Sequence, residues 1–316
     1  MRLLGFDIGG TKCAVIIGEY DDGEINIVKK EKIATDLTVV PETMLERICA
    51  LADKLRSGES VDRIGISCGG PLNSVTGHIL GPPNLPGWEN VPVVDILTKR
   101  YGVPTHLQND ANACAVAEWK FGSGRGTQNM IFLTFGTGLG AGLILNGQLY
   151  AGTNDMAGEA GHIRLDNYGP AGYGKRGSFE GFCSGSGLAQ MGYTMAMEAT
   201  QNGARPLYFP KGTTVDQVTA KTIADAAEQG DKTAVEVYRL CGEYLGKGLS
   251  VLIDILNPEV IVIGSIFTRS ESLLKESMEK VLQREALPAA RDCCRIFPAA
   301  LGESLGDYAA LATALL

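Results

Sequence analysis

Two glycine-rich segments of this chain match each other, and a chain that repeats such a unit can adopt few folds. The first reads FDIGGTKCAVIIG (residues 6–18) and the second LTFGTGLGAGLILN (residues 133–146). With Gly9 aligned to Gly136, each is an apolar strand, a glycine-rich turn and a second apolar strand. A duplicated unit predicts two related halves whose turns point into one cleft. Two unrelated β-hairpins are the alternative, but the second turn holds far more glycine than a hairpin needs.

The remaining segments alternate between strand and helix patterns. Apolar runs predict strands at 3–8, 13–18, 24–32, 63–70, 104–108 and 259–264, besides the two within 129–147. Helical spacing predicts helices at about 41–55, 111–121, 219–231, 233–257, 270–285 and 308–316, whereas 152–187 is rich in loops. This alternation predicts an α/β protein. We expect a small N-terminal domain of residues 1–117 plus about 302–316, and a larger domain of residues 118–301.

Composition excludes several classes of partner. The net charge is −8 and no run of Lys or Arg stands out, which argues against a nucleic-acid-binding protein. No apolar stretch reaches the length of a membrane span, and the first residues lack a signal-peptide pattern. The eight cysteines are scattered, mostly in apolar segments, as expected for buried thiols in a reducing compartment. We therefore expect a cytoplasmic protein with small-molecule ligands.

The two glycine-rich turns are candidate phosphate sites. Backbone N–H groups of tight turns bind anions, and a lysine adds a mobile positive charge. The first turn comprises Gly9, Gly10, Thr11 and Lys12, directly after Asp7, and the second comprises Gly136, Thr137 and Gly138. Together they could hold different phosphates of one nucleotide.

Two further segments carry polar groups suited to chemistry. Asn109 and Asp110 lie where a strand gives way to a helix, so Asp110 could accept a proton from an attacking hydroxyl and Asn109 could bond a neighbouring one. Capping of the helix explains either residue equally well. Glu159, His162 and Glu180 could bind a metal or a polyhydroxylated ligand, or could be unrelated polar residues of a surface loop. A structural zinc site usually contains several cysteines, and Cys183 is the only cysteine near these residues in the sequence.

In this order the motifs resemble those of the ROK family, which comprises repressors, open reading frames and sugar kinases within the actin-like ATPase (RNase H-like) fold. DIGGTK and FGTGLGAG resemble its two phosphate motifs, and NDANACAVAE resembles the segment with its catalytic Asp. EAGH with Glu180 resembles its sugar-binding signature, and IVIGS its adenosine motif. The resemblance covers essentially the whole chain. It implies a two-domain fold and phosphoryl transfer from MgATP to a hexose hydroxyl, usually the 6-hydroxyl.

The resemblance also implies a role for each matching residue. Asp110 would be the catalytic base, and Asp7 would help to place Mg²⁺ through water. The sugar would be held by Gly70, Asn109, Asp110, Glu159, His162 and Glu180. ATP would be held by Asp7, Gly9, Gly10, Thr11, Lys12, Thr134, Gly136, Thr137, Gly138 and Gly264. We expect a homodimer that binds ATP and a small sugar.

Two positions depart from the family pattern. Many members carry a Cys-x-Cys-Gly-x-x-Gly-Cys zinc motif, but Ala171, Tyr173 and Ser178 stand in its cysteine places, so we expect no zinc site. Ser265 follows Gly264 where the adenosine motif usually has a second glycine, which bears on nucleotide preference.

The alternatives concern substrate and class. Glucose is the first candidate substrate, with N-acetylhexosamines, fructose, allose and β-glucosides as others. A sugar-sensing repressor of the same family would carry an N-terminal helix-turn-helix domain, whereas the first phosphate motif here begins at residue 3. We therefore expect a kinase.

Overall fold

The computed structural model describes all 316 residues, which form two compact units. Unit 1 comprises residues 1–126, 142–157 and 300–316, and unit 2 comprises residues 127–141 and 158–299. The predicted domains divided the chain after residue 117; the observed unit 1 keeps the whole helix that follows Asn109 and also includes residues 142–157. None of the helices combines the length and the apolar character needed to cross a membrane.

Unit 1 contains a five-stranded sheet in the order β3-β2-β1-β4-β7. The strands are β1 (Arg2–Ile8), β2 (Lys12–Asp21), β3 (Glu24–Ala34), β4 (Arg63–Cys68) and β7 (Thr105–Asn109). β1, β2 and β3 pair antiparallel, whereas β1, β4 and β7 pair parallel. The two-stranded ribbon of β5 (Leu72–Asn73) and β6 (His78–Ile79) follows β4. The strand predictions for this half are confirmed to within three residues, because each strand is an apolar run that ends in a turn or a polar residue.

Helices cover both faces of this sheet. Residues Leu4, Phe6 and Ile8 of β1 belong to one apolar core with α1 (Pro41–Arg56) and α2 (Val93–Tyr101). On the other side, Gly5 of β1 faces α10 (Leu305–Thr313), and α10 packs in turn against α3 (Asp110–Phe121). The sequence predicted α1 and α3 but missed α2, whose short amphipathic stretch is held in place by its contact with α1.

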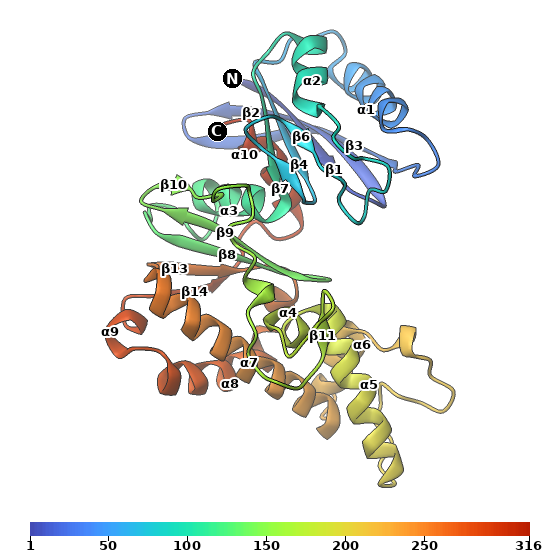
Figure 1. Ribbon diagram of the computed structural model, residues 1–316, viewed down its shortest axis with the longest axis vertical. Helices are drawn as coiled ribbons and strands as arrows, with labels where there is room; N and C mark the ends of the chain where they lie inside the picture. The colour runs from blue at the N-terminus through green and yellow to red at the C-terminus, as the bar shows by residue number, and fades with distance from the viewer. The chain divides into compact units, whose positions relative to one another are not determined.

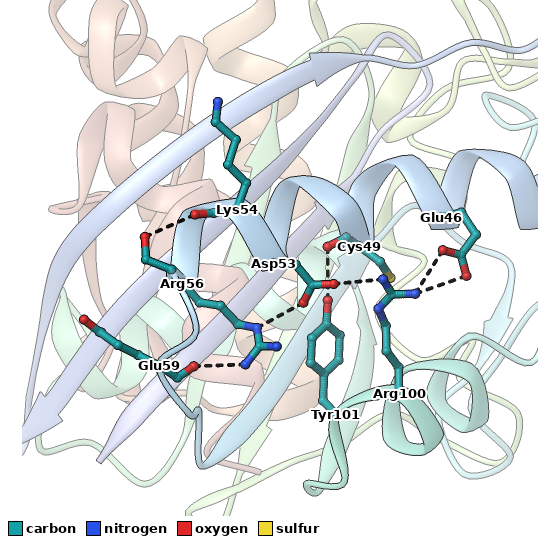
Figure 2. Close-up of polar contacts among 9 residues, drawn as sticks. Glu46, Cys49, Asp53, Lys54, Arg56, Glu59, Arg100 and Tyr101 are labelled. Carbon is teal, nitrogen blue, oxygen red and sulfur yellow. Dashed lines mark hydrogen bonds and ion pairs between the residues drawn. The ribbon is translucent and has the colours of Figure 1, made fainter.

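Polar side chains join α1 to α2 along their exposed edges, as Figure 2 shows. Arg100 of α2 donates hydrogen bonds to Glu46 (2.9 Å) and to Asp53 (2.8 Å), both on α1. Asp53 also accepts a hydrogen bond from Arg56, and the Tyr101 hydroxyl donates to the Cys49 carbonyl oxygen at 3.3 Å. These contacts hold the two helices side by side on the sheet.

The C-terminal helix α10 packs on the N-terminal sheet because two strand positions are glycine. A Cβ atom on Gly65 would lie 2.0 Å from the Ala310 carbonyl oxygen, and one on Gly5 would lie 3.1 Å from the Ala310 Cβ. Only glycine allows so close an approach. The last residues of the chain thereby complete unit 1.

The second sheet has the order β10-β9-β8-β13-β14, which repeats the order of the first. Its strands are β8 (Met130–Phe135), β9 (Leu139–Leu145), β10 (Gln148–Leu149), β13 (Val260–Ile263) and β14 (Arg295–Pro298). β8, β13 and β14 pair parallel, as β1, β4 and β7 do. The duplication inferred from the two glycine-rich turns therefore extends to whole sheets.

Unit 2 carries the remaining helices, several of which differ from the sequence prediction. They are α4 (Phe179–Phe182), α5 (Gly185–Gln201), α6 (Ala220–Glu228), α7 (Lys232–Leu256), α8 (Ile266–Glu285) and α9 (Pro288–Arg291). α7 and α8 pack along each other beneath β13 and β14 (Figure 1). The predicted helix at 270–285 begins four residues earlier, and α5 was not predicted because its glycines weaken the helical pattern.

Candidate active site

The first glycine-rich turn joins β1 to β2 and is closely packed. The Gly9 amide donates to the Lys12 carbonyl oxygen at 3.2 Å, which closes the turn. A Cβ atom on Gly10 would lie 2.1 Å from the Asn84 carbonyl oxygen, so this position must be glycine. Thr11 and Lys12 are exposed at the tip of the turn. Asn84, which the sequence analysis missed, also contacts Gly69 and lies in a loop marked only by its prolines.

Asp7 lies in a group of carboxylates at the end of β1. Its pKa is raised to about 6, first by burial and then by the carboxylates of Asp307 and Asp110, although Lys30 and Lys12 act in the opposite direction. Lys30 forms an ion pair with Asp307, which the first turn of α10 brings to the site from far along the chain. A carboxylate held among others in a poorly solvated place favours a bound cation.

These carboxylates suit a magnesium ion that also binds phosphate. No group of three or more His, Cys, Asp or Glu side chains in the chain could hold a metal by itself. Mg²⁺ commonly binds through one or two carboxylates, water and the phosphates of a nucleotide. Asp7 meets that description.

Asn109 and Asp110 occupy the point where β7 meets α3. The Asn109 side chain caps the helix, because its Oδ1 accepts a hydrogen bond from the Asn112 amide at 2.8 Å. This bond uses the oxygen, and the side-chain amide group can still donate to a hydroxyl. Capping and ligand binding, which the sequence left as alternatives, are therefore compatible.

The environment of Asp110 suits a carboxylate that accepts a proton. The Asp110 side chain is exposed to solvent, yet the protein atoms around its carboxylate desolvate it enough to raise its pKa. The Ala111 amide donates to Asp110 Oδ1 at 2.8 Å and partly offsets that rise. A raised pKa makes a carboxylate a stronger proton acceptor.

The carboxyl ends of the parallel strands bring the predicted residues of unit 1 together. β1 ends before Gly9, β4 ends before Gly70, and β7 ends at Asn109. In a parallel sheet these ends meet at one edge, where ligands bind in α/β proteins. Gly70 is exposed there and precedes a cis peptide bond to Pro71.

In unit 2, the second glycine-rich turn lies against the start of α5. The Gly185 amide donates to the Gly136 carbonyl oxygen at 2.7 Å, and the Ser186 hydroxyl donates to the Thr137 carbonyl oxygen at 3.0 Å. The Thr134 hydroxyl oxygen accepts from the Gly140 amide at 2.9 Å, so Thr134 links the two strands of the hairpin.

A cavity of about 730 Å³ opens beside this turn. It lies within the size range of small-molecule sites. Helices α5, α6, α7 and α8 line it, and its lining includes Gly136, Thr137, Ser186, Ala224, Ser265 and Arg269. Gly264 continues β13 by donating to the Leu133 carbonyl oxygen, and Ser265 then turns into the cavity wall with φ 54° and ψ −108°. A nucleoside could occupy this space.

Glu159, His162 and Glu180 lie on or directly beside two short helices of unit 2. Glu159 precedes the 3₁₀ helix η1 (Ala160–His162), and both Glu159 and His162 are exposed. Glu180 lies on α4, and its Oε2 accepts a hydrogen bond from the Leu139 amide at 2.9 Å. A Cβ atom on Gly138 would lie 2.7 Å from the same oxygen. Glu180 is therefore adjacent to the second glycine-rich turn.

Comparison with known proteins adds independent information. The model of the ROK family matches residues 3–315. A glucokinase from Streptomyces coelicolor is 34% identical over 282 residues, which cover 89% of this chain and 87% of the relative.

Solved structures of the family show the same fold. A ROK family glucokinase from Streptomyces griseus, in complex with glucose and AMPPNP, has a TM-score of 0.79 at 32% identity, covering 100% of this chain and 99% of that chain. A ROK family transcriptional regulator, a homolog of the E. coli MLC protein, has a TM-score of 0.82 at 26% identity, covering 99% and 77%. The fold is thus the two-domain actin-like ATPase fold.

Proposed function

Because this chain belongs to the ROK family, we propose that it is a sugar kinase that transfers the γ-phosphoryl group of ATP to a hexose hydroxyl. Glucose is the first candidate sugar, since a similar protein is a glucokinase and a similar structure contains glucose and AMPPNP. The observation that carries the proposal is the solvent-accessible Asp110 carboxylate, whose pKa is raised, at the same sheet edge as the first phosphate turn.

In this proposal the attacking group is the 6-hydroxyl of the hexose, and Asp110 accepts its proton. The raised pKa of Asp110 suits that transfer, and a base fixed at the start of a helix is already oriented. Hydrogen bonds between the sugar hydroxyls and Asn109, Glu159, His162, Glu180 and the backbone of Gly70 would select and orient the hexose, with the Asn109 amide group as a donor.

The ATP phosphates would bind the backbone N–H groups of the two glycine-rich turns, with Lys12 as a further cation. The cavity beside Gly136, lined by Ser265, would take the nucleoside. Asp7 would help to hold Mg²⁺, which neutralises phosphate charge when bound. Asp7 lies close enough to Asp110 for the two charges to interact.

A panel of sugars tests substrate and residue together. ATP-dependent ADP release would be measured with glucose, N-acetylglucosamine, N-acetylmannosamine, fructose, allose and a β-glucoside. We expect glucose to have the highest kcat/KM. If no sugar of the panel increases ADP release above the rate measured with ATP alone, the kinase proposal is contradicted.

Asp110→Asn should lower kcat by about 10²–10⁴ while the sugar still binds, because the amide nearly keeps the shape but cannot accept the proton. Asp95→Asn, on the exposed face of α2, is the matched control and should leave kcat unchanged. A near-normal kcat in Asp110→Asn would leave Asp110 with a structural role only.

The ROK family also contains transcriptional regulators, so a sugar sensor is the second candidate. A sensor would be stabilised thermally by its sugar and would release no ADP with any member of the panel. A homodimer stays a prediction, tested by light scattering.

A further inference from the structure

A small hairpin in unit 2 occupies the segment where the cysteines of a zinc motif are replaced. It consists of β11 (Ala171–Gly172) and β12 (Lys175–Arg176). Gln190 of α5 anchors it, since its side chain accepts from the Ala171 amide at 3.0 Å and donates to the Ala171 carbonyl oxygen at 2.8 Å. The Gly177 amide donates to the Pro170 carbonyl oxygen at 2.9 Å and closes its base.

The tip of this hairpin contacts His162. The rings of Tyr173 and His162 meet edge to face, with centroids 5.3 Å apart and planes at 75°. Lys175 Nζ donates to the His162 carbonyl oxygen at 2.5 Å. The side chain and the main chain of His162 are therefore both held by the same hairpin.

Tyr173 keeps its position at a conformational cost. Its φ is 45°, in the left-handed region that few residues other than glycine adopt, and its ring is 74% exposed. Gly174 beside it has φ 75°, so both central residues of this two-residue hairpin have the positive φ that a type I′ turn requires, which Asn or Gly would adopt more readily than Tyr.

The other side of the hairpin contacts Glu180. A Cβ atom on Gly172 would lie 2.6 Å from the Gly181 amide nitrogen and 2.8 Å from the Glu180 Cβ. Gly172 is buried against α4 for this reason. One hairpin thus contacts two residues that we assign to the sugar.

We propose that Tyr173 is a positioning residue that sets the orientation of the His162 imidazole and so contributes to sugar selection. The inference rests on the proposed function, in which His162 bonds a sugar hydroxyl. Without the neighbouring ring, an exposed imidazole on a 3₁₀ helix would sample several rotamers, and binding of the sugar would have to select one. The hairpin that supports this loop carries Tyr173 at one of the positions where the zinc motif has cysteine.

Steady-state kinetics of three tyrosine variants test the effect on sugar binding. Tyr173→Ala should raise KM for the preferred hexose about 3- to 10-fold, with a smaller change in kcat and none in KM for ATP. Tyr173→Phe keeps the ring contact and should restore the normal KM. Tyr168→Ala removes another exposed ring from the same region and should have no effect. An equal rise in KM for ATP would overturn the inference, because it would indicate a general loss of structure.

Imidazole NMR tests the contact itself, independently of activity. The chain has three histidines, His78, His106 and His162, so their ring signals can be assigned with single His→Gln variants. Tyr173→Ala should shift the His162 ring signals alone, since the ring current of Tyr173 is lost. Unchanged His162 signals would overturn the inference.

A His162→Ala variant distinguishes failure of the proposed sugar-binding role of His162 from failure of the proposed positioning role of Tyr173. If it leaves the hexose KM unchanged, His162 does not bind the sugar, and the assignment in the proposed function fails together with this inference. If it raises KM while Tyr173→Ala does not, the inference alone fails and the proposed role of His162 stands.

Discussion

Replacement of Asp7 by asparagine should stabilise the ligand-free protein at neutral pH while weakening its response to MgATP. The pKa of Asp7 is raised to about 6 from 3.8, first by burial and then by Asp307 and Asp110. Such an acid binds its proton more tightly in the folded state, so its ionisation destabilises the fold as pH rises from about 4 to 6. The full pKa difference corresponds to about 3 kcal/mol, which Asp7→Asn should recover.

Urea unfolding of both proteins between pH 4.5 and pH 8, with Mg²⁺ chelated, measures this effect. The advantage of Asp7→Asn should grow from about 1 kcal/mol near pH 4.5 to about 3 kcal/mol above pH 7. The exposed control Asp95→Asn should differ from the parent by less than about 0.5 kcal/mol at every pH. MgATP should raise the melting temperature of the parent protein more than that of Asp7→Asn. A variant that is less stable than the parent at pH 7, or whose advantage does not change with pH, would refute the reasoning.

Two further predictions concern the support of the fold. Glu118 is fully buried and accepts hydrogen bonds from the amides of Ser123 (2.8 Å), Ala300 (3.2 Å) and Leu301 (2.9 Å), so Glu118→Gln should lower the free energy of unfolding by about 3 kcal/mol. In urea unfolding the exposed control Glu46→Gln should cost less than about 1 kcal/mol, and an equal cost would contradict the prediction. Metal analysis after chelation should find no stoichiometric zinc, with activity restored by Mg²⁺ alone; one tightly held zinc per chain would show that the 171–183 segment binds metal in another way.

The elements with strong local patterns could be predicted from sequence. The strand–turn–strand segments at the two glycine-rich turns were found because apolar runs flank residues that only a tight turn accommodates. α1 begins at Pro41 and α3 ends at Phe121, as the proline and Gly122 that bound them indicate. The predicted fold class is confirmed, since both the sheets and the solved relatives have the expected architecture.

The elements that the sequence missed depend on contacts with distant residues. α5 carries glycines that lower its helical propensity, yet a Cβ atom on Gly192 would lie 2.4 Å from Ile223. Those glycines therefore let the helix pack closely, and packing outweighs propensity. β14 is a short edge strand that ends in proline and exists because it pairs with β13.

Some features of the candidate site could likewise be predicted from sequence, whereas others depend on contacts between distant residues. The sequence alone determined the residue types near the phosphate turns and at the strand end with Asn109 and Asp110, because turn and cap patterns are local. Only the tertiary structure decided that Asp307 and Lys30 surround Asp7, and that Tyr173 contacts His162. A pKa and a ring orientation depend on charges and surfaces brought together by folding, and no local pattern encodes a contact between residues 277 positions apart in the chain.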